Sequence, residues 1–217
     1  MKISAPILIF LLVPFLNINA QSWKQLNTEP YAGKQDDICF INENTGWYVN
    51  EFGKVFHTNN GGETWTKQWE QKGSFFRTVA FINDQVGFVG TVGTEYFPNV
   101  TDTIPLYRTR DGGASWEAVS YKGPYVKGLC AIDVVKEQYI NHGNIDYKYH
   151  LFAVGRVGSP ANLLVSHDGG ETWQSKSLQN DCKMLFDIKM LNKNLGFACA
   201  ASSDDISQSH AVILKTT

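Results

Sequence analysis

Short apolar runs alternate with polar turns along most of the chain, and the runs are rich in β-branched and aromatic residues. Runs of this length and composition favour β-strands over helices. Turns with Gly, Asn or Asp separate them at the spacing of hairpins, so the pattern predicts antiparallel meanders. Three runs recur in the same order in four successive units. The first runs are 37–41, 78–82, 128–132 and 186–190; the second are 46–49, 87–90, 151–154 and 196–199; the third are 54–57, 105–108, 162–165 and 212–215.

A motif of the form Ser/Thr-x-Asp/Asn-Gly-Gly-x-Ser/Thr-Trp follows the third run in three of these units. The Asp or Asn side chain is expected to accept backbone hydrogen bonds and close a turn, while the glycines supply positive φ. The Trp is expected to pack between neighbouring units. We therefore interpret the motif residues as structural. They are Thr58, Asn60, Gly62 and Trp65, then Thr109, Asp111, Gly113 and Trp116, then Ser166, Asp168, Gly170 and Trp173.

The repeat predicts an all-β fold, a β-propeller of four-stranded antiparallel blades. Its period of about 50 residues is typical of propeller blades, and the Trp of each motif opens the fourth strand of its unit. One propeller domain is expected over 21–217. Its blades are expected at roughly 35–70, 75–121, 126–178 and 184–217, the last of them incomplete.

The two ends of the predicted domain indicate how the ring is built. Segment 21–28 contains Ser-Trp-Lys-Gln, which looks like an isolated fourth strand that closes a ring. Residues 213–217 match 55–59, which lead into the first motif. An end at this point would leave a strand edge unpaired, so we expect a C-terminally truncated part of a larger ring, lacking further blades or a sorting domain. The alternative is a four-bladed ring closed by Trp23.

Residues 1–20 have the pattern of a secretory signal peptide. Lys2 is the only charge, an apolar run follows at 6–16, and the small residue Ala20 precedes a polar segment. The run is shorter than the ~20 residues that span a bilayer, so no membrane insertion is expected. The sequence therefore predicts a secreted protein, in the periplasm, at the cell surface or outside the cell. The alternative is a buried N-terminal strand or helix.

Composition is that of an ordinary globular protein, with 43% hydrophobic and 18% charged residues and a net charge of -2. Clusters of Lys and Arg are absent, which argues against a nucleic-acid partner. No cysteine or histidine pattern matches metal-ligand spacing, so neither a metal nor a cofactor is predicted. The cysteines are expected to be free, buried thiols, although export would permit disulfides. They are Cys39, Cys130, Cys182 and Cys199.

The motif resembles the Asp box, also called the bacterial neuraminidase repeat. The longer unit Asn-x-x-x-Gly-Trp, strand, motif is similar to photosystem II stability/assembly factor-like propellers, and 42–65 matches it best. Segments 83–88 and 192–197 repeat its first half, so the resemblance covers nearly all of 21–217. It implies the propeller fold but several functions, because Asp boxes also occur in sialidases, xyloglucan-cleaving glycosidases and sortilin-type receptors. The segment Ala20-Gln21 resembles the signal-peptide ends of secreted bacterial proteins of the Bacteroidetes.

Catalytic signals are weak. A sialidase needs three converging arginines, but the chain has four in all, one of them (Arg110) inside a motif, and lacks the Arg-Ile-Pro signature. A glycosidase needs two carboxyl groups about 5–10 Å apart. We interpret the candidates as turn or solvent-facing residues; they are Asp36, Asp37, Asp102, Asp187, Asp204 and Asp205.

These observations favour a secreted, non-catalytic propeller that binds or scaffolds a protein or glycan partner. The alternatives are a glycoside hydrolase, sialidase-like or xyloglucanase-like, with catalytic residues partly outside this chain, and an adhesion protein in which the propeller is a spacer. Long loops at 91–104, 156–161 and 201–210 share one face, where partners would dock. The insertion 136–150, on the other face, is either a second contact surface or a longer hairpin. The candidate contact residues are Tyr96, Phe97, Arg156, Asp204 and Asp205.

Overall fold

The computed structural model describes residues 22–156, 158 and 160–216, which form antiparallel sheets. One short helical segment occurs among them, the 3-10 helix η1 (Ile206–Gln208). No helix in this part of the chain has the length and apolar character needed to cross a membrane. The signal peptide expected at 1–20 lies outside the described residues.

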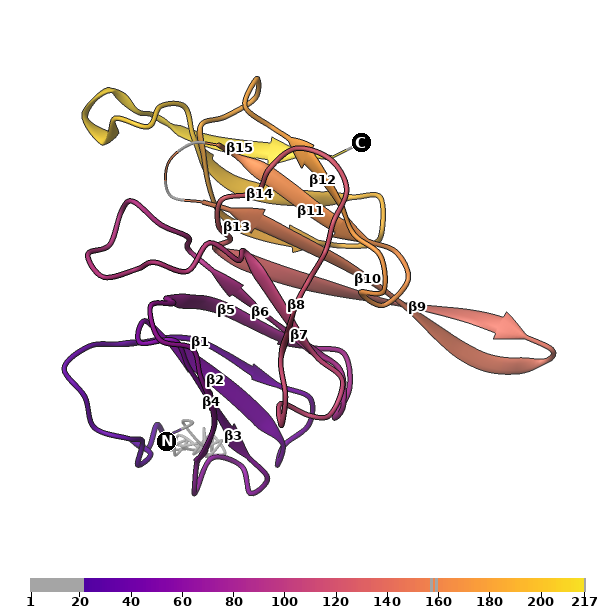
Figure 1. Ribbon diagram of the computed structural model, residues 1–217. Helices are drawn as coiled ribbons and strands as arrows, with labels where there is room; N and C mark the ends of the chain where they lie inside the picture. The colour runs from indigo at the N-terminus through magenta and orange to yellow at the C-terminus, as the bar shows by residue number, and fades with distance from the viewer. Residues whose placement is uncertain (1–21, 157, 159, 217) are drawn as a thin grey trace, which may run out of the picture.

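Four sheets follow one another along the described chain, and Figure 1 shows them as a curved series from bottom to top. Consecutive strands pair within each sheet. The first sheet contains β1 (Gln35–Phe40), β2 (Gly46–Asn50), β3 (Lys54–Thr58) and β4 (Thr66–Glu70); the second contains β5 (Phe76–Phe81), β6 (Gly87–Thr91), β7 (Leu106–Thr109) and β8 (Glu117–Ala118). The third contains β9 (Ala131–Asn141), β10 (Asn144–Gly155), β11 (Asn162–Ser166) and β12 (Gln174–Ser177); the fourth contains β13 (Met184–Met190), β14 (Gly196–Ala201) and β15 (Ala211–Lys215).

The fourth sheet has three strands among the described residues, and the described part of the expected closing segment, 22–28, belongs to none of the sheets. Residues 22–28 have no regular secondary structure, and Trp23 is 97% exposed. The N-terminal segment instead follows the first sheet, where Glu29 Oε1 lies 2.5 Å from Lys54 Nζ. The outer edge of β15 lies at the opposite end of the series in Figure 1, away from this segment.

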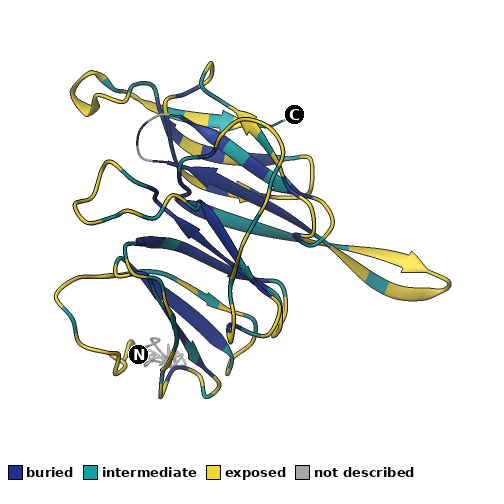
Figure 2. Cartoon of the chain, viewed as in Figure 1, coloured by how far each residue is buried: buried dark blue, intermediate teal, exposed yellow. Residues whose placement is uncertain are grey.

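The core lies between the sheets, where apolar side chains from neighbouring blades interlock. Between the first and second sheets, the Trp47 ring stacks on Phe81 with centroids 3.5 Å apart. Between the second and third, Phe88 meets Trp173 edge-on with centroids 5.4 Å apart. A third cluster around Phe152 joins the third and fourth sheets. Figure 2 shows the buried strands stacked through the middle of the molecule, so burial between blades holds the series together.

The first strands of three sheets contain a register shift at the same place. The shifts fall at Asp36 in β1, Arg77 in β5 and Phe186 in β13. A bulge of this kind leaves one residue out of the pairing and redirects its side chain. Since β1 and β5 contact each other, the bulges bring Asp36 and Arg77 together at one end of the two strands.

Candidate functional site

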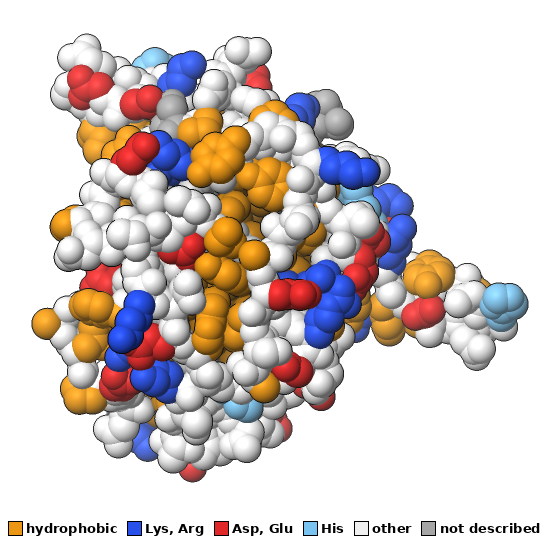
Figure 3. Space-filling view, viewed as in Figure 1, with side chains coloured by type: hydrophobic (Ala, Val, Ile, Leu, Met, Phe, Trp, Pro, Cys, Tyr) orange, Lys and Arg blue, Asp and Glu red, His pale blue; other side chains and the backbone are white. Residues whose placement is uncertain are grey.

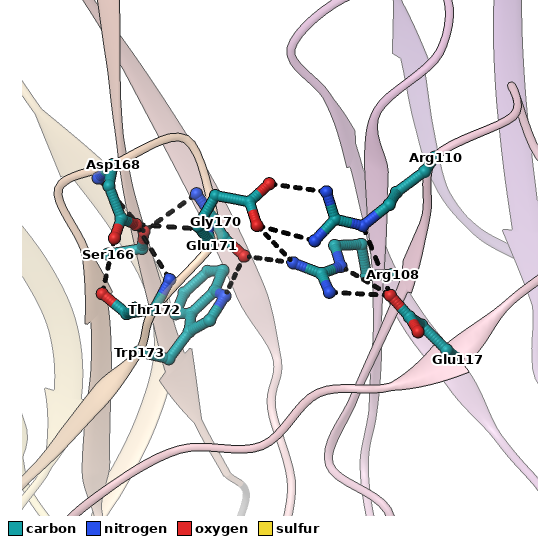
Figure 4. Close-up of polar contacts among 9 residues, drawn as sticks. All are labelled: Arg108, Arg110, Glu117, Ser166, Asp168, Gly170, Glu171, Thr172 and Trp173. Atoms are coloured by element: carbon teal, nitrogen blue, oxygen red, sulfur yellow. Dashed lines mark hydrogen bonds and ion pairs between the residues drawn. The ribbon is translucent and has the colours of Figure 1, made fainter.

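The Asp boxes use their polar groups to close their own turns. In the third box, Ser166 Oγ donates to Asp168 Oδ1 at 2.7 Å and accepts from Gly170 N at 2.9 Å. Asp168 also accepts from Thr172 N at 3.0 Å, and Trp173 Nε1 donates to the Gly170 carbonyl at 3.0 Å. Figure 4 shows these groups turned toward one another within the loop. They are therefore not available to a ligand.

The other two boxes have the same turn with small differences. Asn60 Oδ1 accepts from Thr58 Oγ1 at 2.8 Å and from Thr64 N at 3.0 Å, so an amide replaces the carboxylate without loss of the turn. Trp65 Nε1, by contrast, is buried without a hydrogen-bond partner. In the second box, hydrogen bonds from the side chain and backbone of its Ser residue lower the pKa of Asp111 to about 2.

Two of the four arginines hold the second and third blades together. Arg110 forms a two-point ion pair with Glu171, with Nη1 and Nη2 at 2.7 and 2.6 Å from the carboxylate oxygens. Arg108 donates to the Gly170 carbonyl at 2.9 Å and to Glu117 at 2.7 Å (Figure 4). Neither guanidinium is placed to receive the carboxylate of a sialic acid.

The loop between β6 and β7 presents two aromatic side chains on the opposite face. Tyr96 and Phe97 are 47% and 40% exposed. The Arg156 guanidinium lies 4.6 Å from the centre of the Tyr96 ring, and the Phe97 ring lies 4.6 Å from that of Phe75. Arg156 itself is buried and donates to the Thr94 carbonyl at 2.6 Å. The structure thus places Arg156 beneath the loop as a support, not at the surface as a direct contact for a partner.

A cavity of about 110 Å³ opens beside these aromatic rings. We call it the aromatic cavity. Aromatic rings form much of its wall, and two cationic side chains from the first and second blades lie at it. The residues that line it are Lys34, Phe75, Arg77, Val92, Tyr96, Phe97 and Cys130.

A buried carboxyl group lies next to the cations of the cavity. The Asp36 side chain is fully buried and forms an ion pair with Lys34, while Arg77 Nη1 lies 3.7 Å from its Oδ1. Burial raises the pKa of Asp36, and the two cations oppose that effect. Its Oδ2 is buried without a hydrogen-bond partner. A second carboxylate lies close by, because Glu51 Oε1 accepts from Lys34 N at 3.3 Å, so two cationic groups and two carboxylates meet beside the cavity.

Most of the other acidic candidates are already engaged as acceptors. Asp37 Oδ2 accepts from Thr78 Oγ1 at 2.9 Å, which ties the first blade to the second. Asp102 accepts from Tyr107 Oη at 2.9 Å. Asp205 caps η1 by accepting from the backbone two residues on, and neither it nor Asp204 lines the aromatic cavity. Asp187 accepts from Ile188 N at 2.8 Å, so it too is held by a backbone donor.

Two cysteines are less buried than expected: Cys39 is half-buried and Cys199 is exposed. Cys39 and Cys182 are free thiols whose pKa is raised by burial, and Cys130 is buried at the aromatic cavity. Cys199 is a free thiol that is exposed, not buried. It lies on β14, on the face of the fourth sheet that no described sheet covers.

The sequence interpretation missed Lys34, Phe75 and Arg77. They lie at or just before the first strands of two blades, where the strand pattern predicts side chains that alternate between blade faces. The bulge at Arg77 breaks that alternation and leaves no mark in the sequence. Two positions in the loop at 156–161, residues 157 and 159, lie outside the described residues.

Comparison with known proteins agrees with the architecture. Residues 164–175 match the BNR/Asp-box repeat family, and no curated protein matches the chain. The structure resembles the GH74 enzyme of Niastella koreensis with a TM-score of 0.51 and 16% identity, over 83% of this chain and 28% of that one. It resembles the computationally designed Ika4 protein with a TM-score of 0.55 and 8% identity, over 91% and 100%. YCF48 bound to D1 peptide has a TM-score of 0.40 and 17% identity, over 85% and 70%.

At these identities the similarity concerns the fold. The predicted β-propeller of four-stranded antiparallel blades is confirmed, and so is the Asp-box repeat. The chain spans 28% of the length of the GH74 enzyme.

Proposed function

We propose that this Asp-box β-propeller is a secreted, non-catalytic binding protein that holds a protein or glycan partner at the aromatic cavity. The observation that carries the proposal is the cavity itself, which three aromatic rings and two cationic side chains line. Aromatic rings and Arg are the residue types enriched at binding surfaces. The Asp boxes lie at the other end of the blades and have their polar groups engaged internally.

Contacts beneath Tyr96 and Phe97 hold the two rings in place, so a partner could bind with little rearrangement of the loop between β6 and β7. Phe97 rests on Phe75, and Tyr96 rests on the guanidinium of Arg156. The same loop is tied down by an ion pair between Glu95 and Lys127. A pre-ordered aromatic surface loses less conformational entropy on binding than a mobile one. The rings would stack on a sugar or on an apolar side chain, and Lys34 and Arg77 would meet hydroxyl or carboxylate oxygens.

The test is a binding screen of the intact protein against a glycan array and a peptide library, followed by titration of any hit. Phe97→Ala should weaken binding roughly tenfold, since it removes about 1.4 kcal/mol of stacking and burial. Phe52→Ala is the matched control, because Phe52 is also a half-exposed Phe but lies outside the cavity. Equal losses in the two variants would refute the assignment of the cavity.

A glycoside hydrolase with catalytic residues partly outside this chain is the second candidate. One observation favours it: the buried Asp36 has a raised pKa, as a general acid needs. Such an enzyme also needs a second carboxylate about 5–10 Å away, and Asp37 is committed to Thr78. Hydrolysis of a polysaccharide that disappears in Asp36→Asn, with binding retained, would establish the enzyme and overturn the first proposal.

Export is the remaining part of the proposal, and it rests on residues 1–20. Expression in a bacterial host should yield a mature protein that begins at Gln21. N-terminal sequencing of the exported protein tests this. An uncleaved protein retained in the cytoplasm would contradict it.

A further inference from the structure

The β9–β10 hairpin extends well beyond its blade. The two strands pair continuously from Asn141↔Asn144 to Ala131↔Val154. Residues 136–148 project past the neighbouring strands, and we call this segment the arm. Figure 1 shows the arm at the right of the molecule, and the loop between β6 and β7 at the left. The insertion predicted from the sequence therefore forms a long hairpin at the end of the blades opposite the aromatic cavity, and its shape is compatible with a contact surface.

One face of the arm is apolar and exposed. Ile140 and Ile145 are directly opposed across the hairpin and are 78% and 63% exposed. Tyr147 continues the same face, and Lys136 Nζ lies 3.8 Å from the centre of its ring. Figure 3 shows hydrophobic side chains on the surface of the arm, away from the body. An ordered projection that holds large apolar side chains in water is typical of a contact surface.

The outer edge of the arm along β10 is unpaired among the described residues. Strand β11 pairs with β10 only from Leu151 to Gly155. The carbonyl of Tyr149 accepts from Gly169 N at 3.0 Å, and the paired section of the edge begins there. From Asn144 to Lys148 the edge is open. A two-stranded ribbon with an open edge is a template for a further strand.

The sequence of this edge is complementary to itself. Along β10, Ile145, Tyr147 and Tyr149 share one face, and Asp146 and Lys148 share the other. Two copies paired antiparallel about Tyr147 would place each Asp146 opposite a Lys148 and each Ile145 opposite a Tyr149. Opposite charges and aromatic–aliphatic pairs are the cross-strand neighbours that stabilise sheets. Hydrogen bonds from Tyr147 N, Tyr139 and Asn141 lower the pKa of Asp146 and so favour its carboxylate form.

The other edge of the arm lacks this property. An antiparallel pair of β9 strands centred on Gln138 would place Lys136 opposite Ile140 and Glu137 opposite Tyr139. Glu137 is already bound to Lys193 of the fourth blade, at 2.9 Å. By contrast, Lys148 forms no ion pair with the described residues and is available to a carboxylate of a second chain.

We infer that the arm is a dimerisation element, in which β10 pairs antiparallel with β10 of a second copy to form a four-stranded sheet across a two-fold axis. A two-fold contact uses the same surface on both chains and closes on itself. The apolar faces of both arms then become continuous. Both aromatic cavities stay open, because they lie at the opposite end of the blades.

A disulfide placed on the axis tests the register. Directly opposed residues in an antiparallel pair have Cα atoms about 5.5 Å apart, which is within the range that a disulfide spans. Tyr147→Cys in a Cys199→Ser background should therefore cross-link to a covalent dimer on mild oxidation. Gln138→Cys is the control, because Gln138 opposes Tyr147 within the hairpin but lies on the other edge. Equal cross-linking of the two variants, or none with Tyr147→Cys, would overturn the inference.

A charge exchange tests the contact in solution, with sedimentation velocity as the measurement. The unmodified protein should sediment as a dimer. Asp146→Lys should raise the dimer dissociation constant about tenfold, because it opposes two like charges at each of two symmetric places. Asp146→Lys combined with Lys148→Asp should restore the dimer. A monomeric unmodified protein, or a double variant no better than the single one, would refute the proposal. Unchanged circular dichroism and melting temperature would show that each variant is folded.

Discussion

The second glycine of the third Asp box gives the sharpest test of how the box joins two blades. Gly170 has φ +88°, and a Cβ built there would lie 2.0 Å from Cζ of Phe88. Phe88 belongs to β6 of the preceding blade and is fully buried, so its ring has no room to move. Gly169, its neighbour, has φ +73°, but the nearest atom to a Cβ there is Ile82 Cδ1 at 3.7 Å. Comparing substitutions at Gly169 and Gly170 therefore separates the cost of backbone strain from the cost of a steric clash between blades.

Substitution with Ala should destabilise the two positions unequally. Left-handed backbone costs an L-residue about 1–2 kcal/mol, and both variants carry this cost. Gly170→Ala also overpacks the interface with Phe88, which adds roughly 1–3 kcal/mol. We expect Gly169→Ala to lose about 1–2 kcal/mol of unfolding free energy and Gly170→Ala roughly 2–5 kcal/mol. Urea unfolding followed by Trp fluorescence measures both.

A compensating variant checks the cause. Phe88→Leu replaces the ring that meets the new methyl group with a smaller side chain. Gly170→Ala combined with Phe88→Leu should therefore lose less free energy of unfolding than the sum of the two single losses. Contacting residues show such couplings, on the order of 0.5–3 kcal/mol. Equal losses of free energy in the two glycine variants would contradict a clash with Phe88, and so would a loss in the double variant that equals the sum of the single losses.

Three further outcomes are expected. Burial is the main cause that lowers the pKa of His167 in the folded state, so the unfolded chain binds more protons. The free energy of unfolding should therefore fall as the pH drops through about 6.5. Urea titrations at pH 7.5 and 5.5 measure this fall, which should be smaller in His167→Gln. Arg110→Ala breaks an exposed ion pair with Glu171 and should lose less than about 1 kcal/mol, a loss that disappears in high salt if the pair is electrostatic. Asp168→Asn should lose less stability than Asp168→Ala, because Asn60 closes the same turn in the first box; equal losses in chemical denaturation would contradict this.

The features that were predictable from sequence are local. Strand periodicity predicts all four blades, and three of them also contain a box whose donors and acceptors lie within eight consecutive residues, as in 166–173. Tyr96 and Phe97 were found as candidates because they interrupt a loop that is longer than its turn requires. No distant partner is needed for any of these inferences.

The features that were missed depend on contacts between blades. Arg156 was expected at the surface, but it is buried under Tyr96 because its guanidinium reaches carbonyls of another blade, including that of Thr94. Asp36 and Arg77 meet at the positions where register shifts occur in two separate strands. The closing strand around Trp23 stays a prediction, because it depends on pairing with a distant strand edge and not on local sequence.

The aromatic cavity and the arm lie at opposite ends of the blades, which makes a joint prediction possible. If arms pair two chains and each chain keeps its cavity open, the dimer is bivalent, and on a densely coated surface its second contact becomes intramolecular. Asp146→Lys should then leave the affinity for a soluble, monovalent ligand unchanged, because Asp146 is remote from the cavity. Retention on a dense surface of the same ligand should fall by about 100-fold or more. Surface plasmon resonance at high and low ligand density measures both. If Asp146→Lys lost affinity for the soluble ligand, the arm would influence the cavity. If Asp146→Lys and the unmodified protein were retained equally at high ligand density, each cavity would bind on its own.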